Sequence, residues 1–85
     1  MKVEVKLFAV AKQLAGAEAI SIELPAGATV QDLRDALGEQ RTELRDIIAR
    51  SMIAIDAKYV SNDARVPNSV PENSEIALIP PVSGG

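Results

Sequence analysis

The residues of this chain with the most distinctive potential chemistry are the last six, Pro80-Pro81-Val82-Ser83-Gly84-Gly85. Two consecutive glycines have no Cβ, so they can enter a slot that is too narrow for other residues. The two prolines cannot donate backbone hydrogen bonds and have a fixed φ, which favours a stiff, extended spacer. Six extended residues reach roughly 20 Å. We therefore expect the carboxylate of Gly85 to be delivered into the active site of another protein.

The composition excludes most kinds of self-contained catalytic site. The 85 residues include no cysteine and no histidine, so the usual nucleophile, the usual neutral-pH base and the commonest metal ligands are absent. A formal net charge of −3 and a single phenylalanine and tyrosine argue against nucleic-acid binding. The N-terminus is charged at alternate positions, unlike a signal peptide, and no apolar run has membrane-spanning length. We expect one small cytoplasmic domain with no metal, no bound cofactor and no membrane partner.

Alternation of apolar and polar residues predicts the first two strands of this domain. Residues 2–7 and 19–24 each place apolar side chains at every second position, as in a half-buried strand. Residues 9–15 between them predict a short helix, with Val10 and Leu14 four positions apart and a glycine placed to end it. The two strands are expected to be antiparallel neighbours.

The main helix is predicted to begin at Thr29. The Thr29 hydroxyl can cap the first turn, and Asp32 three residues later resembles the second half of a capping box. We expect Gly38 to interrupt or end this helix, and a second helical stretch to run to about residue 50. The apolar stripe of the main helix consists of Val30, Leu33 and Leu37.

The residue pattern in the second half of the chain predicts further strands, and the order of all the elements then predicts the fold. Residues 52–57 read as a strand that ends in a turn, residues 59–60 as a short strand, and residues 71–74 as a β-turn. Residues 75–79 form the last strand, which the proline at position 80 stops. This order predicts an α+β fold, the β-grasp or ubiquitin-like roll: a mixed sheet packed on one main helix, with the first and last strands parallel neighbours. The domain would span residues 1–79 and the extended tail residues 80–85.

Two apolar residues break the alternation of their strands. Phe8 directly follows the inward-facing Leu7. Ile79 directly follows the inward-facing Leu78, so both side chains are predicted to point away from the core. In a β-grasp fold they lie at the same end of adjacent strands, where the tail departs. An exposed apolar patch at that point is typical of a docking surface.

The whole chain resembles the small-subunit family of molybdopterin synthase. The most specific element is the ending from Ile79 to Gly85, followed by Leu7-Phe8-Ala9 leading into a helix with Lys12 and Leu14. The resemblance implies a β-grasp sulfur carrier. It also implies that Phe8, Lys12, Ile79 and the tail bind the large subunit, in a heterotetramer. The family commonly has Asn-Gly where this chain has Asp56-Ala57.

The resemblance also implies a reaction at Gly85. A ubiquitin-activating-type adenylyltransferase uses ATP to adenylate this glycine, and sulfur from a sulfurtransferase then converts it to a thiocarboxylate. The tail, including Gly84, enters the large subunit, where the sulfur builds the dithiolene of molybdopterin from cyclic pyranopterin monophosphate. The chain is thus expected to be one subunit of a heteromeric sulfurtransferase whose catalytic side chains lie on the large subunit. A group carrier of this kind needs no catalytic side chains of its own.

Three other functions are compatible with these residues. The sulfur carrier of thiamine thiazole synthesis also ends in Gly-Gly, but that family is typically shorter and lacks the Pro-Pro spacer. A ubiquitin-like protein modifier would be joined to target lysines through Gly85. In a purely structural β-grasp interaction domain, the diglycine would have no role. The partner that copurifies with the chain would distinguish these possibilities.

Overall fold

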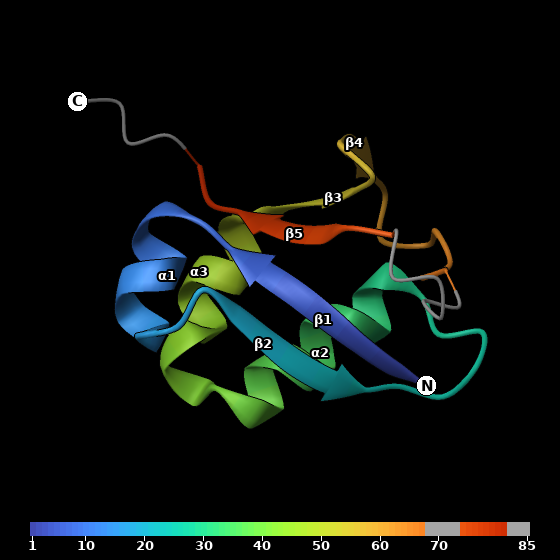
Figure 1. Cartoon of the computed structure of the whole chain (residues 1–85), viewed down its shortest axis with the longest axis horizontal. Coiled ribbons are helices and arrows are strands. Elements are labelled where there is room, and N and C mark those ends of the chain that lie inside the picture. Colours follow the sequence, from blue (N-terminus) through green and yellow to red (C-terminus); the bar gives the residue numbers. More distant parts are fainter. Residues whose placement is uncertain (68–73, 82–85) are drawn as a thin grey trace.

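One mixed sheet organises the computed structural model, which describes residues 1–67 and 74–81. Its described strands are β1 (Lys2–Leu7), β2 (Ala19–Glu23), β3 (Met52–Ile55), β4 (Lys58–Val60) and β5 (Ile76–Ile79). They are ordered β2-β1-β5-β3-β4, as can be followed in Figure 1. The pair β1–β5 is parallel, and the other neighbouring pairs are antiparallel. The predicted β-grasp topology is confirmed, with the last strand at the centre of the sheet.

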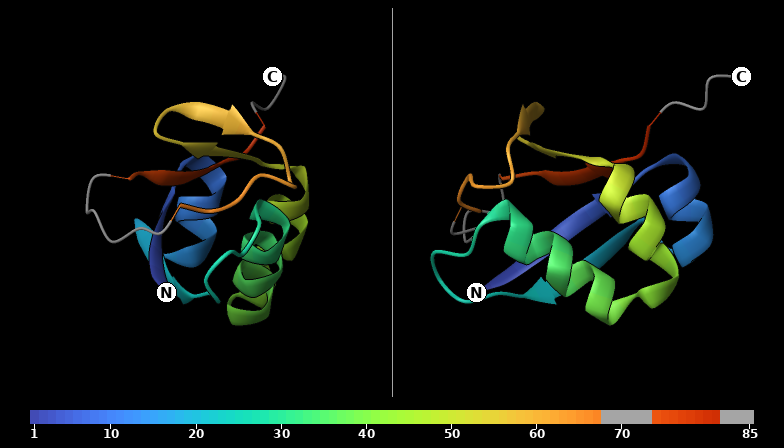
Figure 2. Two further views of the ribbon diagram at one scale, coloured as in Figure 1. Left: turned by 90° about the vertical axis from the view of Figure 1, so that its right-hand side faces the viewer. Right: turned by 180° about the vertical axis from the view of Figure 1, so that it is seen from behind.

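The helices lie between β1 and β2 and between β2 and β3. They are α1 (Ala9–Ala15), α2 (Val30–Gln40), the 3-10 helix η1 (Thr42–Leu44) and α3 (Arg45–Arg50). Figure 2 shows α2 and α3 together on one face of the sheet. The predicted capping box is present, because Asp32 N–H donates to Thr29 Oγ1 at 3.2 Å and Thr29 N–H donates to Asp32 Oδ2 at 2.9 Å. None of the described helices is long and apolar enough to cross a membrane.

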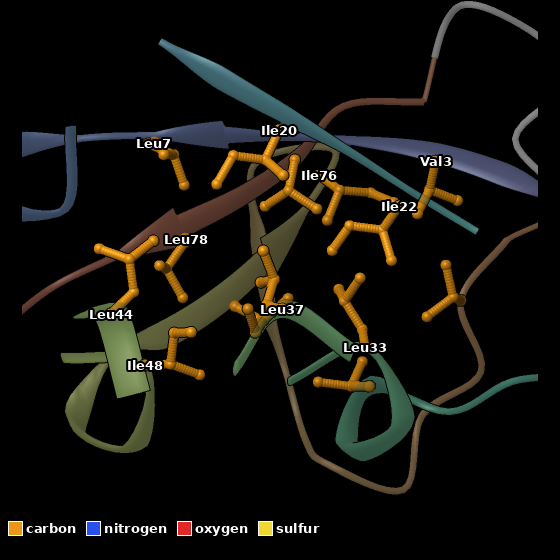
Figure 3. Close-up of a cluster of buried hydrophobic side chains, with 14 of the residues drawn as sticks. Val3, Leu7, Ile20, Ile22, Leu33, Leu37, Leu44, Ile48, Ile76 and Leu78 are labelled. Atoms are coloured by element: carbon orange, nitrogen blue, oxygen red, sulfur yellow. The ribbon is translucent and has the colours of Figure 1, made fainter. Parts of the chain in front are cut away.

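The core lies between the sheet and these helices (Figure 3). Strands β1, β2 and β5 each contribute every second side chain to this core, which confirms the predicted inward faces of the three strands. The predicted apolar stripe of α2 packs against them with no exposed surface, and η1 and α3 complete the enclosure. The largest fully buried side chains are Leu33, Leu37, Leu44, Ile53, Ile76, Leu78, Val3, Val5 and Val30.

The prediction that Gly38 ends the main helix is wrong. Helix α2 continues through this buried residue to Gln40. The Arg45 side chain crosses over Gly38: its Cγ lies 3.4 Å from the position that a Cβ would take, and its Nε donates to the Gly38 carbonyl at 3.0 Å. A Cβ at this position would make an ordinary van der Waals contact, and the hydrogen bond from Arg45 joins the last turn of α2 to the start of α3, a tertiary contact that helix propensity does not include.

Helix α1 has its predicted bounds but not the contacts that its apolar spacing suggested. Its buried residue is Ala11, whereas Val10 and Leu14 have 39% and 51% of their surfaces exposed. The small Ala11 side chain, not the larger apolar ones, is therefore the part of α1 that packs into the core. As predicted, Gly16 ends the helix, with a φ of +66°.

The β3–β4 turn contains a strained alanine. The predicted strand at residues 52–57 ends at Ile55, and Asp56 and Ala57 both have positive φ, 51° and 69°. Asp56 also holds the start of β5, because its Oδ1 accepts from Glu75 N–H at 2.8 Å. A left-handed backbone is costly for alanine, since its Cβ crowds the carbonyl. The turn predicted at residues 71–74 lies, except for Ser74, outside the described residues.

Replacing Ala57 with glycine should stabilise the domain. Ala57→Gly removes the steric cost of a positive φ, partly offset by the greater entropy of the unfolded chain, for a net gain of about 0.5–1 kcal/mol. Thermal unfolding should then occur roughly 3–6 °C higher. The matched control is Ala49→Gly on the exposed face of α3, which should lower the melting temperature instead. A lower melting temperature for Ala57→Gly would contradict the prediction.

Candidate functional site

The candidate site lies where β1 and β5 end side by side. Leu7 pairs with Leu78 in the parallel ladder, and both are buried, at 2% and 0% exposure. The residue that follows each of these two is on the opposite face of the sheet: Phe8, directly after β1, is 45% exposed, and Ile79, the last residue of β5, is half-buried. The prediction that these two residues turn away from the core is confirmed. Both directly follow the Leu7–Leu78 pair, so they lie at the end of β1 and β5 from which the chain continues into Pro80.

Met52 extends this apolar area, and the sequence did not indicate it. It pairs with Ile79 across the antiparallel β3–β5 ladder, and directly opposed residues lie on the same face of a sheet. Its side chain is 46% exposed. Only the strand order brings Met52, 27 positions earlier in the chain, next to the last strand. In the sequence, Met52 is only a methionine at the outward position next to Ile53. Without the pairing register of the strands, this position does not indicate that Met52 lies next to Ile79.

The face of the sheet opposite the helices has an apolar half and a polar half. Over β5, β3 and β4, Ala77 pairs with Ala54, which pairs with Tyr59. Tyr59 is 63% exposed, whereas both alanines are buried. Over β1 and β2, the outward positions instead carry one alanine, Ala19, and five polar residues: Lys2, Glu4, Lys6, Ser21 and Glu23. We call the apolar residues on this face that keep exposed surface the outer apolar surface: Phe8, Met52, Tyr59 and Ile79.

An ion pair marks the border between the two halves. Lys6 Nζ lies 2.6 Å from Glu75 Oε2, and both side chains are half-exposed. The hydrogen bond to Glu75, and secondly its charge, raise the pKa of Lys6. Because folding raises the pKa of Lys6, the ion pair stabilises the fold fully at pH values below the pKa that this lysine has in the unfolded chain. The stabilisation is lost as the pH rises through the pKa of Lys6 in the folded chain. At neutral pH the Lys6 side chain on this border is therefore protonated.

Lys12 is the basic residue predicted at the rim of the docking surface. Its side chain is 53% exposed, on α1, and its Nζ lies 3.9 Å from Glu18 Oε1. This distance is too long for a hydrogen bond, so Lys12 keeps its donors for other groups. It projects from the helix that directly follows Phe8.

The tail begins with one buried and one exposed proline. Pro80 is buried directly after β5, and Pro81 is exposed. The remaining predicted site residues, Val82, Ser83, Gly84 and Gly85, lie outside the described residues. The ring of Pro80 restricts the φ of the residue that directly follows Ile79, so it limits how the chain continues after β5.

The described side chains offer a surface for binding a partner. Within residues 1–67 and 74–81, no group of three or more carboxylates could hold a metal ion. Two of the exposed apolar residues, Phe8 and Met52, lie next to the end of β5, where the chain continues into Pro80. Such an arrangement can hold a partner protein while the end of the chain reaches into it.

Comparisons with known proteins agree with this geometry. The family model described as the ThiS family matches residues 5–85. The molybdopterin synthase sulfur carrier subunit of Arabidopsis thaliana is 31% identical over 85 residues, covering 100% of this chain and 84% of the relative. The solved structure of SAMP1 from Haloferax volcanii is 26% identical, with a TM-score of 0.82 and 100% coverage of both chains. A protein–protein complex of subunits 1 and 2 of the molybdopterin-converting factor from Helicobacter pylori contains a similar chain, with 26% identity, a TM-score of 0.66 and 100% coverage of both chains.

Proposed function

We propose that this chain, which belongs to the ThiS family, is the sulfur carrier subunit of a molybdopterin synthase. The observation that carries the proposal is the outer apolar surface gathered at the root of a tail that ends in Gly-Gly. A relative of that name matches over the full length of this chain. The absence of cysteine and histidine suits a carrier whose reactive atom is on its terminus and whose catalytic groups belong to a partner.

The proposed cycle begins with activation of the terminus. A free carboxylate is a poor electrophile, so an adenylyltransferase partner transfers AMP from ATP to the Gly85 carboxylate and releases pyrophosphate. Sulfide-level sulfur (HS⁻) supplied by a sulfurtransferase then attacks the acyl carbon, forms the C–S bond and displaces AMP with loss of a proton, which leaves a thiocarboxylate. The large subunit positions cyclic pyranopterin monophosphate, and the thiocarboxylate sulfur forms a bond to a carbon of this substrate, displacing an oxygen substituent. Water then cleaves the bond between the Gly85 acyl carbon and that sulfur, which leaves the sulfur on the pterin. After hydrolysis, the carrier is again a carboxylate and can be recharged, in the cytoplasm.

The proposed partner surface explains how one small chain can be held while its tail reacts. Phe8, Ile79 and Met52 would form the apolar centre of the interface, and Lys12 its charged rim. The Helicobacter pylori complex of two converting-factor subunits supports a large subunit as this partner. The thiazole and protein-modifier functions use the same chemistry at the terminus, so only the partner and the product distinguish them.

The decisive experiment combines the chain with its adenylyltransferase, ATP and a sulfur donor, and then with the large subunit and the pterin substrate. Intact-mass analysis should show one oxygen of the terminus replaced by sulfur, and the mixture should then form molybdopterin. A terminal thiocarboxylate that only thiazole synthase consumes, or conjugates of the chain with other proteins, would contradict the proposal.

Truncating Phe8 should weaken the complex without unfolding the domain. Aromatic residues near the centre of an interface typically contribute about 2 kcal/mol or more, so Phe8→Ala should raise the dissociation constant roughly thirtyfold. The matched control is Glu4→Ala, which changes the polar half of the same strand and should leave affinity nearly unchanged. Lys12→Ala should mainly slow association and reduce its salt dependence. Titration calorimetry with the large subunit measures the affinities, and equal affinities for Phe8→Ala and Glu4→Ala would refute this role of Phe8.

A further inference from the structure

The backbone of Ala9 has an unusual conformation at the junction between β1 and α1. Its φ is +53°, in the left-handed region, which residues with a side chain seldom adopt. The strand ends at Leu7 and the helix begins at Ala9, so a single residue, Phe8, lies between them. The left-handed angle allows the chain to pass from strand to helix without a longer loop.

Phe8 is held by hydrogen bonds on both sides. Leu7 N–H donates to the Glu18 carbonyl at 2.8 Å, and the Phe8 carbonyl accepts from Ala11 N–H at 3.1 Å. Phe8 itself is extended, with φ −129° and ψ 157°. Because its neighbours are fixed in a strand and in a helix, the direction of the Phe8 side chain depends on the backbone angles of residues 8 and 9.

The side chain of Ala9 does not explain why this conformation is present. The residue is exposed, so its methyl group fills no space in the core. Strained backbone conformations persist where the surrounding structure enforces them, and they concentrate at functional sites. Here the strained residue directly follows Phe8, an exposed aromatic residue of the outer apolar surface.

We propose that Ala9 is a positioning residue that holds Phe8 outward for the partner. Its left-handed backbone completes the strand-to-helix turn, and this turn presents the Phe8 ring beside Ile79 and the root of the tail. The inference rests on the proposed function, because it requires a partner that binds Phe8.

The chain contains a matched control for this proposal. Ala57 is also an exposed alanine with positive φ, +69°, but it lies in the β3–β4 turn. That turn follows Ile55, which pairs with Ile76 at the start of β5, whereas Ile79 is the last residue of β5 and Phe8 directly follows the end of β1. The same substitution at the two alanines therefore imposes the same backbone conflict at opposite ends of the sheet.

The experiment compares Ala9→Val, Ala57→Val and Ala9→Gly in titrations with the large subunit, each with a thermal melt. Valine is β-branched and resists positive φ, so both valine variants should lose similar stability. Ala9→Val should also bind about tenfold more weakly, because the aromatic anchor is misdirected, whereas Ala57→Val should bind like the original chain. Ala9→Gly accepts a positive φ and should retain affinity within about threefold.

A double-mutant cycle tests whether Ala9 acts through Phe8. In a Phe8→Ala background, Ala9→Val should cause almost no further loss of affinity, because the ring that it misdirects is already absent. Equal affinities of Ala9→Val and Ala57→Val, an undiminished effect of Ala9→Val in that background, or unfolding of Ala9→Val alone would overturn the proposal. If the unaltered chain fails to bind the large subunit, the proposed function fails instead, so the two failures are distinguishable.

Discussion

A chain that lacks Gly85 is expected to fold normally and to transfer no sulfur. An exposed terminus contributes little to stability, so the melting temperature should stay within about 1 °C of that of the full chain. The deletion moves the carboxylate about 3.5 Å from the position at which the activating enzyme and the pterin site would meet it. Reactions that depend on near-contact geometry lose at least about 100-fold for a displacement of about 1 Å, so activity should fall below detection.

Two measurements check this prediction separately. Intact-mass analysis after incubation with the activating enzyme, ATP and a sulfur donor should show no thiocarboxylate on the shortened chain. Calorimetry should still show binding to the large subunit, because Phe8, Met52 and Ile79 are unchanged. Gly84→Ala is the companion variant: it keeps the length but adds a Cβ, and should retain only a small fraction of the activity. Normal molybdopterin formation by the Gly85 deletion would rule out the carrier function.

Leu78→Ala and Ile79→Ala should have opposite consequences although the two residues are adjacent. Leu78 is fully buried between the sheet and the helices, so its truncation leaves a cavity and should cost about 3 kcal/mol. For a domain of this size, that corresponds to a melting temperature roughly 12–24 °C lower. Ile79 is half-buried on the other face, so Ile79→Ala should lower the melting temperature by only a few degrees while weakening the complex roughly tenfold or more.

Thermal melts and calorimetry on both variants decide the question. Leu78→Ala should bind normally when measured well below its melting temperature, because the outer apolar surface is intact. Should Ile79→Ala prove as destabilising as Leu78→Ala while its folded fraction binds normally, Ile79 would be a core residue. The docking surface would then lie elsewhere on the domain.

The sequence predicted most of the fold because the relevant signals are local. Alternation set the faces of β1, β2 and β5, and the Thr29–Asp32 spacing gave the start of α2. The same alternation identified Phe8 and Ile79 as outward residues. A family resemblance and the strand order then placed these two residues together.

What could not be predicted depends on contacts between distant segments. Gly38 was read as a helix end, but the Arg45 side chain crosses it, and no helix propensity records that contact. Val10 and Leu14 have the spacing of a buried stripe, yet Ala11 faces the core. Met52 joins the docking surface only through its pairing with Ile79, which is a property of the sheet register.

The central position of β5 has a mechanical consequence. This strand is hydrogen-bonded on both sides, to β1 in parallel and to β3 in antiparallel orientation, and the tail continues directly from it. A force applied to the tail along the strand axis loads both ladders in shear, so many hydrogen bonds must break together. A partner that binds the tail can therefore exert a force on it without unfolding the domain. In single-molecule force spectroscopy, extension from the C-terminus should give one high-force rupture, with no gradual peeling of β5.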